Sequence, residues 1–198
     1  SDTTAVALAA ALKADRCQIL KDVDGVFTAN PRVVPEARKL DEIAYEEMLE
    51  LASAGSEVLQ SRAVEYAKNY GVVLEVLSSF EVKPGTLVRE EDEEMEQMII
   101  RGIAADKNQA KATLLVVPDT PGVAARIFKA LAGANINVDM IVQNVSAAGV
   151  TDVSFTVAKD DINKTKRVIE PLVKQIQAAG LNFDGDIAKV SIVGVGMK

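Results

Sequence analysis

Residues 109–128 read QAKATLLVVPDTPGVAARIF, and this stretch decides the fold of the second half of the chain. An apolar strand over 111–117 leads through the loop PDTPG into an amphipathic helix over 122–134. Next come expected strands over 137–145 and 151–158, a helix from Asp160 or Asp161 to Ala179, and a short strand near 181–183. This βαββαβ order predicts a ferredoxin-like unit with two helices on one face of an antiparallel sheet.

The opening of that stretch has a partial repeat near the end of the chain. Residues 110–117 read AKATLLVV and residues 188–195 read AKVSIVGV, one complete βαββαβ unit later. Short apolar matches also arise by chance in strand-rich chains, but this offset favours a second unit. We therefore expect one unit over 98–185, with a leading strand over 98–105 that can pair with a second unit starting at 186–198.

The first part of the chain alternates helices with short apolar strands, which predicts an α/β layer with mainly parallel strands. The residues expected on the buried side of the first helix are Ala5, Val6, Leu8, Ala9 and Leu12. Gly71 suits a left-handed cap at the end of another helix. So few strands suggest a partial domain over 1–88. The expected elements are a helix over 3–14 capped by Asp2, a strand over 17–20, helical spacing from Ile43 to Gly55, a helix over 58–70 and a strand over 72–77.

The charge is concentrated in one place. Of the formal net charge of −7, most lies in residues 89–96, REEDEEME, which hold six acids and one arginine. A self-repelling run of this kind is typical of a solvated linker, which we place at 89–97 as a domain boundary; an acidic binding tail is the alternative. No basic run offers a footprint for nucleic acid or an anionic membrane.

Composition excludes several kinds of site. The chain of 198 residues has no histidine, which rules out Ser-His and Cys-His catalysis and most transition-metal sites, so we expect no metal site. The single Cys17 excludes an internal disulfide and favours a reducing cytoplasm, and we expect this thiol to be buried and inert. No apolar run is long enough to span a bilayer.

The loop 118–122 has features that suit an α-amino acid. Gly122 allows a ligand close to the backbone, the first amides of the following helix can receive a carboxylate, and Asp119 can accept an ammonium group. A plain turn before a helix explains the same letters. By alternation, Asn137, Asp139 and Gln143 share one face of the next strand, where they are either ligand-facing or simply solvated.

A second group of polar residues lies in the first part. Asp22, Asp24 and Arg32 surround a strand end, where open α/β sheets bind ligands, and could serve Mg²⁺ and phosphate. Turn formation is the alternative reading. Ser1 and Asp2 at a helix start face phosphate or only cap the helix.

The chain resembles the aspartokinase family over essentially its whole length. SDTTAVALAAALKADRCQI, DVDGVFTANPRVVPEARKLDEI, EEMLELAS and PGTLV resemble the C-terminal half of the catalytic domain. QAKATLLVVPDTPGVAARIF, NINVDMIVQNVS and TDVSFTV resemble the first of two regulatory ACT modules, and IAKVSIVGVGMK the opening of the second. The resemblance implies an amino-acid-kinase fold that phosphorylates the side-chain carboxylate of L-aspartate with Mg-ATP. It also implies feedback inhibition by lysine, threonine or both, bound at ACT–ACT interfaces.

The resemblance carries roles to individual residues. In the kinase part it implies a catalytic Asp2, a substrate- and phosphate-facing Ser1, and nucleotide-binding positions at Lys21, Asp22, Phe27, Arg32 and Glu57. In the ACT part it implies effector-binding positions at Asp119, Pro121, Gly122, Ala124, Asn137, Asp139, Gln143 and Asn144.

Several kinase positions depart from the family pattern. Lys21 replaces a threonine, Phe27 replaces a tyrosine and Asn30 an aspartate, and Glu57 replaces a lysine that contacts nucleotide. A carboxylate at position 57 would repel phosphate oxygens. The N-terminal Lys-x-Gly-Gly-[Thr/Ser] motif that supplies a catalytic lysine is absent, so the chain alone is expected to be catalytically incomplete and to hold no tightly bound cofactor.

Three interpretations remain open. The leading one is a fragment of a feedback-regulated, cytoplasmic aspartokinase that assembles as a homo-oligomer through its ACT modules. A non-catalytic amino-acid-binding regulatory subunit that works beside a complete kinase chain is the alternative, favoured by Lys21 and Glu57. An engineered chain is the third.

Overall fold

A computed structural model describes residues 1–91, 100–144 and 149–194. The chain divides into two compact units, and β5 and β8 each cross the boundary between them. The first unit comprises Ser1–Asp106 and Val190–Lys198, and the second comprises Lys107–Lys189. The acidic linker expected at 89–97 lies largely outside the described residues.

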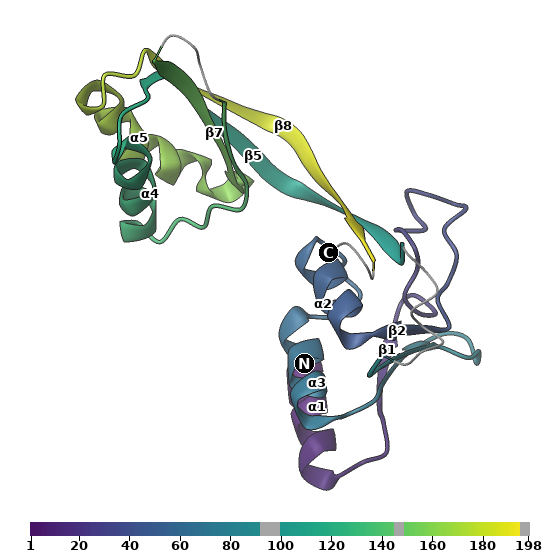
Figure 1. Ribbon diagram of the computed structural model, residues 1–198. Coiled ribbons are helices and arrows are strands. Elements are labelled where there is room, and N and C mark those ends of the chain that lie inside the picture. The colour runs from purple at the N-terminus through teal and green to yellow at the C-terminus, as the bar shows by residue number, and fades with distance from the viewer. Residues whose placement is uncertain (92–99, 145–148, 195–198) are drawn as a thin grey trace. The chain divides into compact units, whose positions relative to one another are not determined.

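The first unit combines helices with short strands, which follow one another in the order α1, β1, β2, α2, α3, β3, β4 (Figure 1). In its sheet, with strand order β1-β3-β4-β2, the β1–β3 and β2–β4 pairs are parallel and the β3–β4 pair is antiparallel. Its elements up to the acidic run are α1 (Asp2–Leu12), β1 (Cys17–Lys21), β2 (Glu42–Ala44), α2 (Tyr45–Ser53), α3 (Ser61–Tyr70), β3 (Leu74–Ser78) and β4 (Thr86–Arg89).

Two of these strands were not expected from the sequence. Ile43, assigned to a helical pattern, lies in β2, and β4 covers Thr86–Arg89, where no strand was expected and of which only Arg89 belongs to the expected linker. Each strand is only three or four residues long, and Ile43 is the register partner of Val88. Pairing between distant segments therefore creates these strands, which local propensity does not signal.

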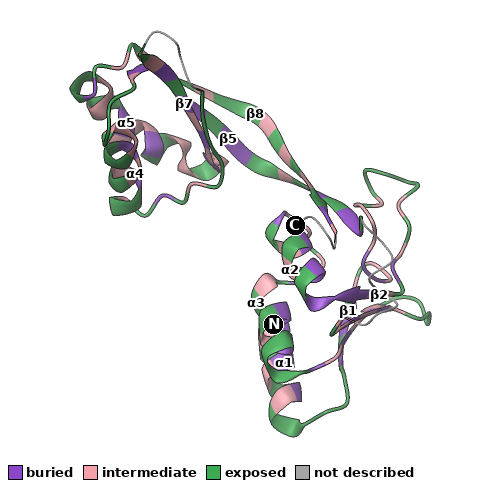
Figure 2. Ribbon diagram, in the orientation of Figure 1, coloured by how far each residue is buried: buried purple, intermediate pink, exposed green. Residues whose placement is uncertain are grey.

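The buried face expected for α1 is confirmed at Val6 and Ala9 and wrong at Leu8 and Leu12. Leu8 and Leu12 are 59% and 70% exposed, whereas Val6 and Ala9 are buried. Figure 2 shows both buried and exposed residues along α1. The sequence DTTAVALAAAL is apolar around most of the helix, so periodicity alone does not select the face that packs. Asp2 lies within α1, and Ser1 occupies the N-cap position.

The second unit has the βαββαβ order that the sequence predicts. Its sheet has the strand order β6-β7-β5-β8, with antiparallel β5–β7 and β6–β7 pairs, and both helices cover one face (Figure 1). Phe155 of the sheet meets Phe128 edge to face at 5.8 Å between ring centroids. The elements are β5 (Gly102–Pro118), α4 (Val123–Gly133), β6 (Ile141–Gln143), β7 (Val150–Ala158), a 3₁₀ turn η2 (Lys159–Asp161), α5 (Ile162–Gln175) and β8 (Gly180–Val193).

Strand lengths in this unit depart from the expectation in both directions. The strand expected over 137–145 is reduced to β6, while β8 continues through position 186, where a new unit was expected to begin. Of the leading strand expected over 98–105, residues 102–105 form the first part of β5, residues 100 and 101 precede it, and 98 and 99 lie outside the described residues. The helix α5 ends at Gln175, and Gln177 is left-handed. Neighbouring strands determine these lengths, since β5 and β8 are hydrogen-bonded to each other.

Candidate functional sites

The carboxylate of Asp2 and the ammonium of Lys21 form an ion pair in the first unit. Asp2 begins α1 and Lys21 ends β1, and Nζ of Lys21 lies 2.9 Å from Oδ2 of Asp2. The hydroxyl of Ser1 lies 3.4 Å from the other carboxylate oxygen, and the backbone N–H of Gln60, at the start of α3, also donates to this group. Asp2, which the resemblance implies to be catalytic, is thus ion-paired with Lys21, which stands where the family has threonine.

This pairing changes the acidity of nearby groups. Burial acts to raise the pKa of Asp2, but the hydrogen bond and positive charge of Lys21 outweigh it, and the pKa is lowered overall. Burial, and then the negative charge of Asp2, raise the pKa of the Cys17 thiol. Cys17 is buried as expected, and its raised pKa makes it a poor nucleophile.

The remaining nucleotide-side residues are more exposed. Arg32 Nη2 lies 2.6 Å from Oδ2 of Asp22, so the two residues expected to face phosphate or Mg²⁺ bind each other on the surface. Phe27 is half-buried and forms an isolated bridge with Lys39. Glu57 is exposed. Phosphate would therefore have to compete with carboxylates for Lys21 and Arg32.

The loop that carries Asp22, Phe27 and Arg32 is attached to the sheet by Thr86. This fully buried hydroxyl donates to the Leu40 carbonyl at 2.6 Å and accepts from the Val26 N–H at 2.8 Å. A Cβ at Gly25 would lie 2.5 Å from Thr86 Oγ1, so glycine is required by this close approach. No sequence pattern indicates this role of Thr86, because its partners are 46 and 60 residues away.

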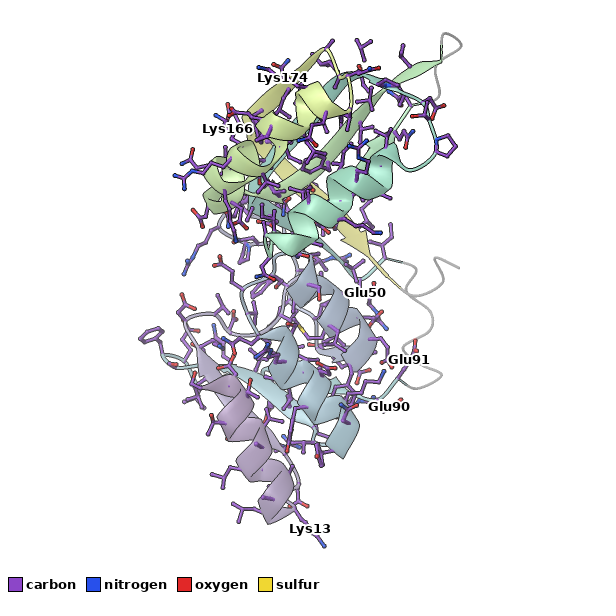
Figure 3. The ribbon with its side chains drawn as sticks, turned by 90° about the vertical axis from the view of Figure 1, so that its left-hand side faces the viewer. Lys13, Glu50, Glu90, Glu91, Lys166 and Lys174 are labelled. Atoms are coloured by element: carbon purple, nitrogen blue, oxygen red, sulfur yellow. The ribbon has the colours of Figure 1, made fainter. Side chains whose placement is uncertain are left out.

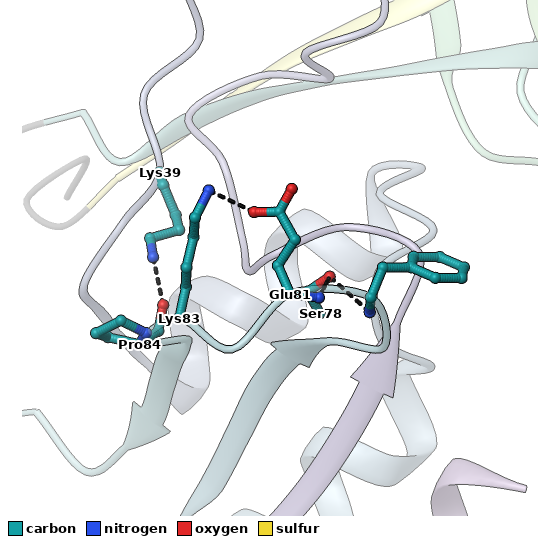
Figure 4. A network of polar contacts seen from close by, with 6 residues as sticks. Lys39, Ser78, Glu81, Lys83 and Pro84 are labelled. Atoms are coloured by element: carbon teal, nitrogen blue, oxygen red, sulfur yellow. Dashed lines mark hydrogen bonds and ion pairs between the residues drawn. The ribbon is translucent and has the colours of Figure 1, made fainter.

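The loop between β3 and β4 also contacts this segment (Figure 4). Lys39 donates to the Pro84 carbonyl, and Lys83 pairs with Glu81. Ser78 Oγ accepts from the N–H groups of Phe80 and Glu81, which forms the turn after β3. Lys39, in the loop that carries Phe27 and Arg32, is thus bound to a backbone carbonyl of the loop between β3 and β4.

In the second unit, five of the expected effector residues line one cavity of about 320 Å³. Gly122, the N-cap of α4, has φ +94°, a left-handed conformation that favours glycine and turns the chain into the helix. Asp119 and the first turn of α4 border this space, and Gln143 reaches it from β6. The expected residues in the lining are Asp119, Pro121, Gly122, Ala124 and Gln143; Val117, Pro118, Thr120, Val123, Thr151 and Val153 complete it.

Three expected effector residues lie outside that lining. The Asp139 carboxylate pairs with Lys189 of β8, and the Asn144 carbonyl accepts from the Thr151 hydroxyl. Asn137 is exposed in the segment before β6. Sequence alternation put Asn137, Asp139 and Gln143 on one strand face, but β6 includes only Gln143 of the three. The sequence analysis did not identify Thr151, a buried polar residue of β7 that lines the cavity. The available signal was a threonine within an apolar strand.

A shallower hollow of about 470 Å³ lies against α5 and β8. Lys166 and Lys174 project from α5 (Figure 3), and the Lys166 ammonium lies 5.2 Å from the centre of the Phe183 ring. None of the expected site residues lines it.

Two further observations concern metals and membranes. Within residues 1–91, 100–144 and 149–194, no group of three or more Cys, Asp or Glu side chains could hold a metal ion. No helix in the described part of the chain is long and apolar enough to cross a membrane.

Comparison with known proteins agrees with this division into two units. The profile of the amino acid kinase family matches residues 1–78, and an ACT domain profile matches residues 116–171. The aspartate kinase of Pseudomonas fluorescens is 58% identical over the whole chain, which covers 48% of that protein.

Solved structures give the same result. The crystal structure of Clostridium acetobutylicum aspartate kinase matches with a TM-score of 0.84 and 26% identity, over 100% of this chain and 45% of that one. The structure of E. coli aspartokinase III in complex with lysine and aspartate matches with a TM-score of 0.71 and 32% identity, over 98% and 43% of the two chains. The chain spans about half the length of the curated relatives it matches, and by sequence and fold it belongs to the aspartokinase family.

Proposed function

We propose that this chain is the amino-acid-binding, regulatory part of an aspartokinase, together with part of its kinase domain. The cavity that gathers Asp119, Gly122 and Gln143 beside the start of α4 carries the proposal. The amides of a helix start receive a carboxylate, and Asp119 accepts the ammonium group of the same α-amino acid. Lysine, threonine or both are the proposed effectors, and the similar E. coli enzyme was crystallised with lysine.

In the whole protein, we propose, the kinase domain transfers the γ-phosphoryl group of ATP to the side-chain carboxylate of L-aspartate in the cytoplasm. The similarity over the full chain supports this activity. Mg²⁺ would neutralise charge on the nucleotide, which phosphoryl transfer requires. Effector binding in the ACT unit would shift the kinase towards a less active arrangement.

A second candidate is a regulatory subunit without kinase activity. It is favoured by the Asp2–Lys21 ion pair, which occupies the carboxylate proposed to be catalytic, and by the exposed carboxylate at Glu57. Titration with ATP separates the two candidates. If Glu57→Lys in a full-length kinase context tightens ATP binding, position 57 faces phosphate, and its glutamate favours the regulatory subunit. An unchanged affinity places the side chain elsewhere and removes this support.

Self-association through the ACT unit is part of the proposal. The strand β6 is at an edge of its sheet, and its residues Ile141 and Val142, together with the preceding Met140, are about half exposed. An apolar edge with free backbone groups suits pairing with a second copy. Light scattering should give twice the monomer mass or a larger multiple. A chain that remains strictly monomeric at a concentration of roughly 100 µM would contradict the proposal.

Calorimetry tests the binding proposal directly. L-lysine or L-threonine should bind the purified 198-residue chain, and Asp119→Ala should weaken binding about tenfold or more because it removes the partner of the ammonium group. Asp160→Ala is the matched control, because this carboxylate is exposed and lies outside both the cavity lining and the expected effector positions. Absence of heat with both amino acids in a folded chain would overturn the proposal.

A further inference from the structure

Val116, beside the amino-acid cavity, has an unusual backbone conformation. Its φ is +53°, in the left-handed region that β-branched residues rarely adopt. The side chain is 46% exposed although its neighbours Leu114 and Val117 are buried. Some interaction must hold this residue in a conformation that its own side chain disfavours.

The cause is a β-bulge in the pairing of β5 with β7. Leu114 is opposite Val153 and Val117 is opposite Thr151, so β5 has one more residue than β7 between these pairs. Ala110, Ala112 and Leu114 are buried, and regular alternation would bury Val116 next. Instead the extra residue reverses the alternation, and Val117 is 1% exposed.

Asp152 supplies the interaction that holds the bulge. Its carboxylate accepts the Val116 N–H at 2.8 Å on the exposed face of the sheet. Hydrogen bonds from a backbone N–H to a carboxylate are among the stronger ones in proteins. The neighbours of Asp152 along β7, Thr151 and Val153, point to the opposite face, where they line the cavity.

The bulge determines how the chain enters the cavity. Lining residues begin directly after it, at Val117, and continue through the loop to Ala124. The N–H of Asp119 donates to the Gly149 carbonyl at 3.0 Å, which fixes the loop against the start of β7. With regular alternation, Val117 would face the other side of the sheet and the cavity would lose part of its wall.

We propose that Asp152 and Val116 are positioning residues for amino-acid binding. The Asp152 carboxylate holds Val116 in the left-handed bulge, and the bulge places Val117 and Asp119 at the cavity without Asp152 itself lining it. This inference rests on the proposed amino-acid binding function and adds a determinant of affinity on the opposite face of the sheet.

Calorimetry with L-lysine and L-threonine on the 198-residue chain tests the inference. Asp152→Ala should lower the affinity about tenfold, because the strained residue loses its partner. Glycine adopts positive φ freely, so Asp152→Ala combined with Val116→Gly should recover affinity to within about threefold of the parent. This rescue distinguishes positioning from a general loss of stability, since the added glycine contributes no contact.

Two variants serve as controls. Ser154→Ala removes a hydroxyl on the same face of β7, where it meets Thr113 at 3.0 Å in regular register, and should change affinity less than about twofold. Asp152→Asn retains a carbonyl acceptor and should weaken binding less than Asp152→Ala. Unchanged affinity in folded Asp152→Ala, or a double variant no tighter than Asp152→Ala, would overturn the inference.

Amide hydrogen exchange gives a readout that needs no ligand. Exchange at Val116 and Asp119 should become about tenfold faster in Asp152→Ala, and Val116→Gly should restore slow exchange at Asp119. If the parent binds neither amino acid, the proposed function fails, and amide exchange alone then tests whether Asp152 holds Val116 in the bulge. Unchanged exchange at both amides in Asp152→Ala overturns the positioning role.

Discussion

The two units place their expected site residues in opposite ways. In the first unit the charged residues are paired with one another, Lys21 with Asp2 and Arg32 with Asp22. In the second unit, Asp119 and Gln143 line a cavity. The ACT unit thus has a formed space for a small ligand, whereas the kinase-like unit shows charges that neutralise each other. The difference favours amino-acid binding over phosphoryl transfer as the activity to measure first in this chain.

The largest effect that tests this comparison is expected at a buried ion pair of the first unit. Arg101 Nε lies 2.8 Å from Glu47 Oε1, and the two side chains are 5% and 4% exposed. Arg101→Met leaves the Glu47 charge buried without this cation, which should lower the free energy of unfolding of this unit by about 3–5 kcal/mol.

Tyrosine fluorescence during urea unfolding measures that loss specifically. The three tyrosines, at 45, 66 and 70, all lie in the first unit, and the chain has no tryptophan. Arg16→Met, which removes a partly exposed pair with Glu75, should cost about 1 kcal/mol or less. Equal losses in the two variants would contradict the special role of the buried pair.

The next largest effect is expected at Thr86. Thr86→Val keeps the shape of the side chain but removes both hydrogen bonds to the loop that carries Arg32, at a cost of about 1–3 kcal/mol. Tyrosine fluorescence should show the loss, and amide exchange at Val26 should accelerate. Thr28→Val, which removes an exposed bond to the Arg38 N–H, is the control with a smaller expected loss.

A smaller, pH-dependent effect is expected at Lys21. Because the pKa of Asp2 is lower in the folded chain, its ionised form stabilises the first unit above its unfolded pKa of about 4. That contribution is lost as pH falls through the lower, folded pKa. Lys21→Thr should cost about 1 kcal/mol at pH 7 and less at pH 2. A cost that is equal at both pH values would show that the ion pair does not stabilise the fold.

The smallest effect is expected at the surface pair. Asp22→Asn removes the partner of Arg32, and both residues are exposed, so the free energy of unfolding should change by about 0.5 kcal/mol or less. A change above about 1 kcal/mol by urea unfolding would mean that the pair organises the loop. It would then weaken the contrast between the two units.

Much of the fold was predictable from local pattern. The βαββαβ order, the helix after PDTPG and the left-handed end at Gly71 all follow from periodicity and turn chemistry. The short strands β2 and β4 could not be predicted in this way, because they exist only through pairing with each other and with β3. The buried face of α1 was wrong at Leu8 and Leu12 since an almost wholly apolar helix carries no facial signal.

For the sites, the sequence by itself identified which residue types stand at which positions, including Asp119 and Gly122 at a strand–helix junction. It also determined that a lysine stands at position 21 and a valine at position 116. Only the tertiary structure decided that Lys21 is bound to Asp2 and that Asp152 holds Val116 in a bulge beside the cavity. The physical reason is distance along the chain. Partners 19 and 36 residues apart are brought together by sheet pairing and packing, and local sequence preferences act only over a few residues.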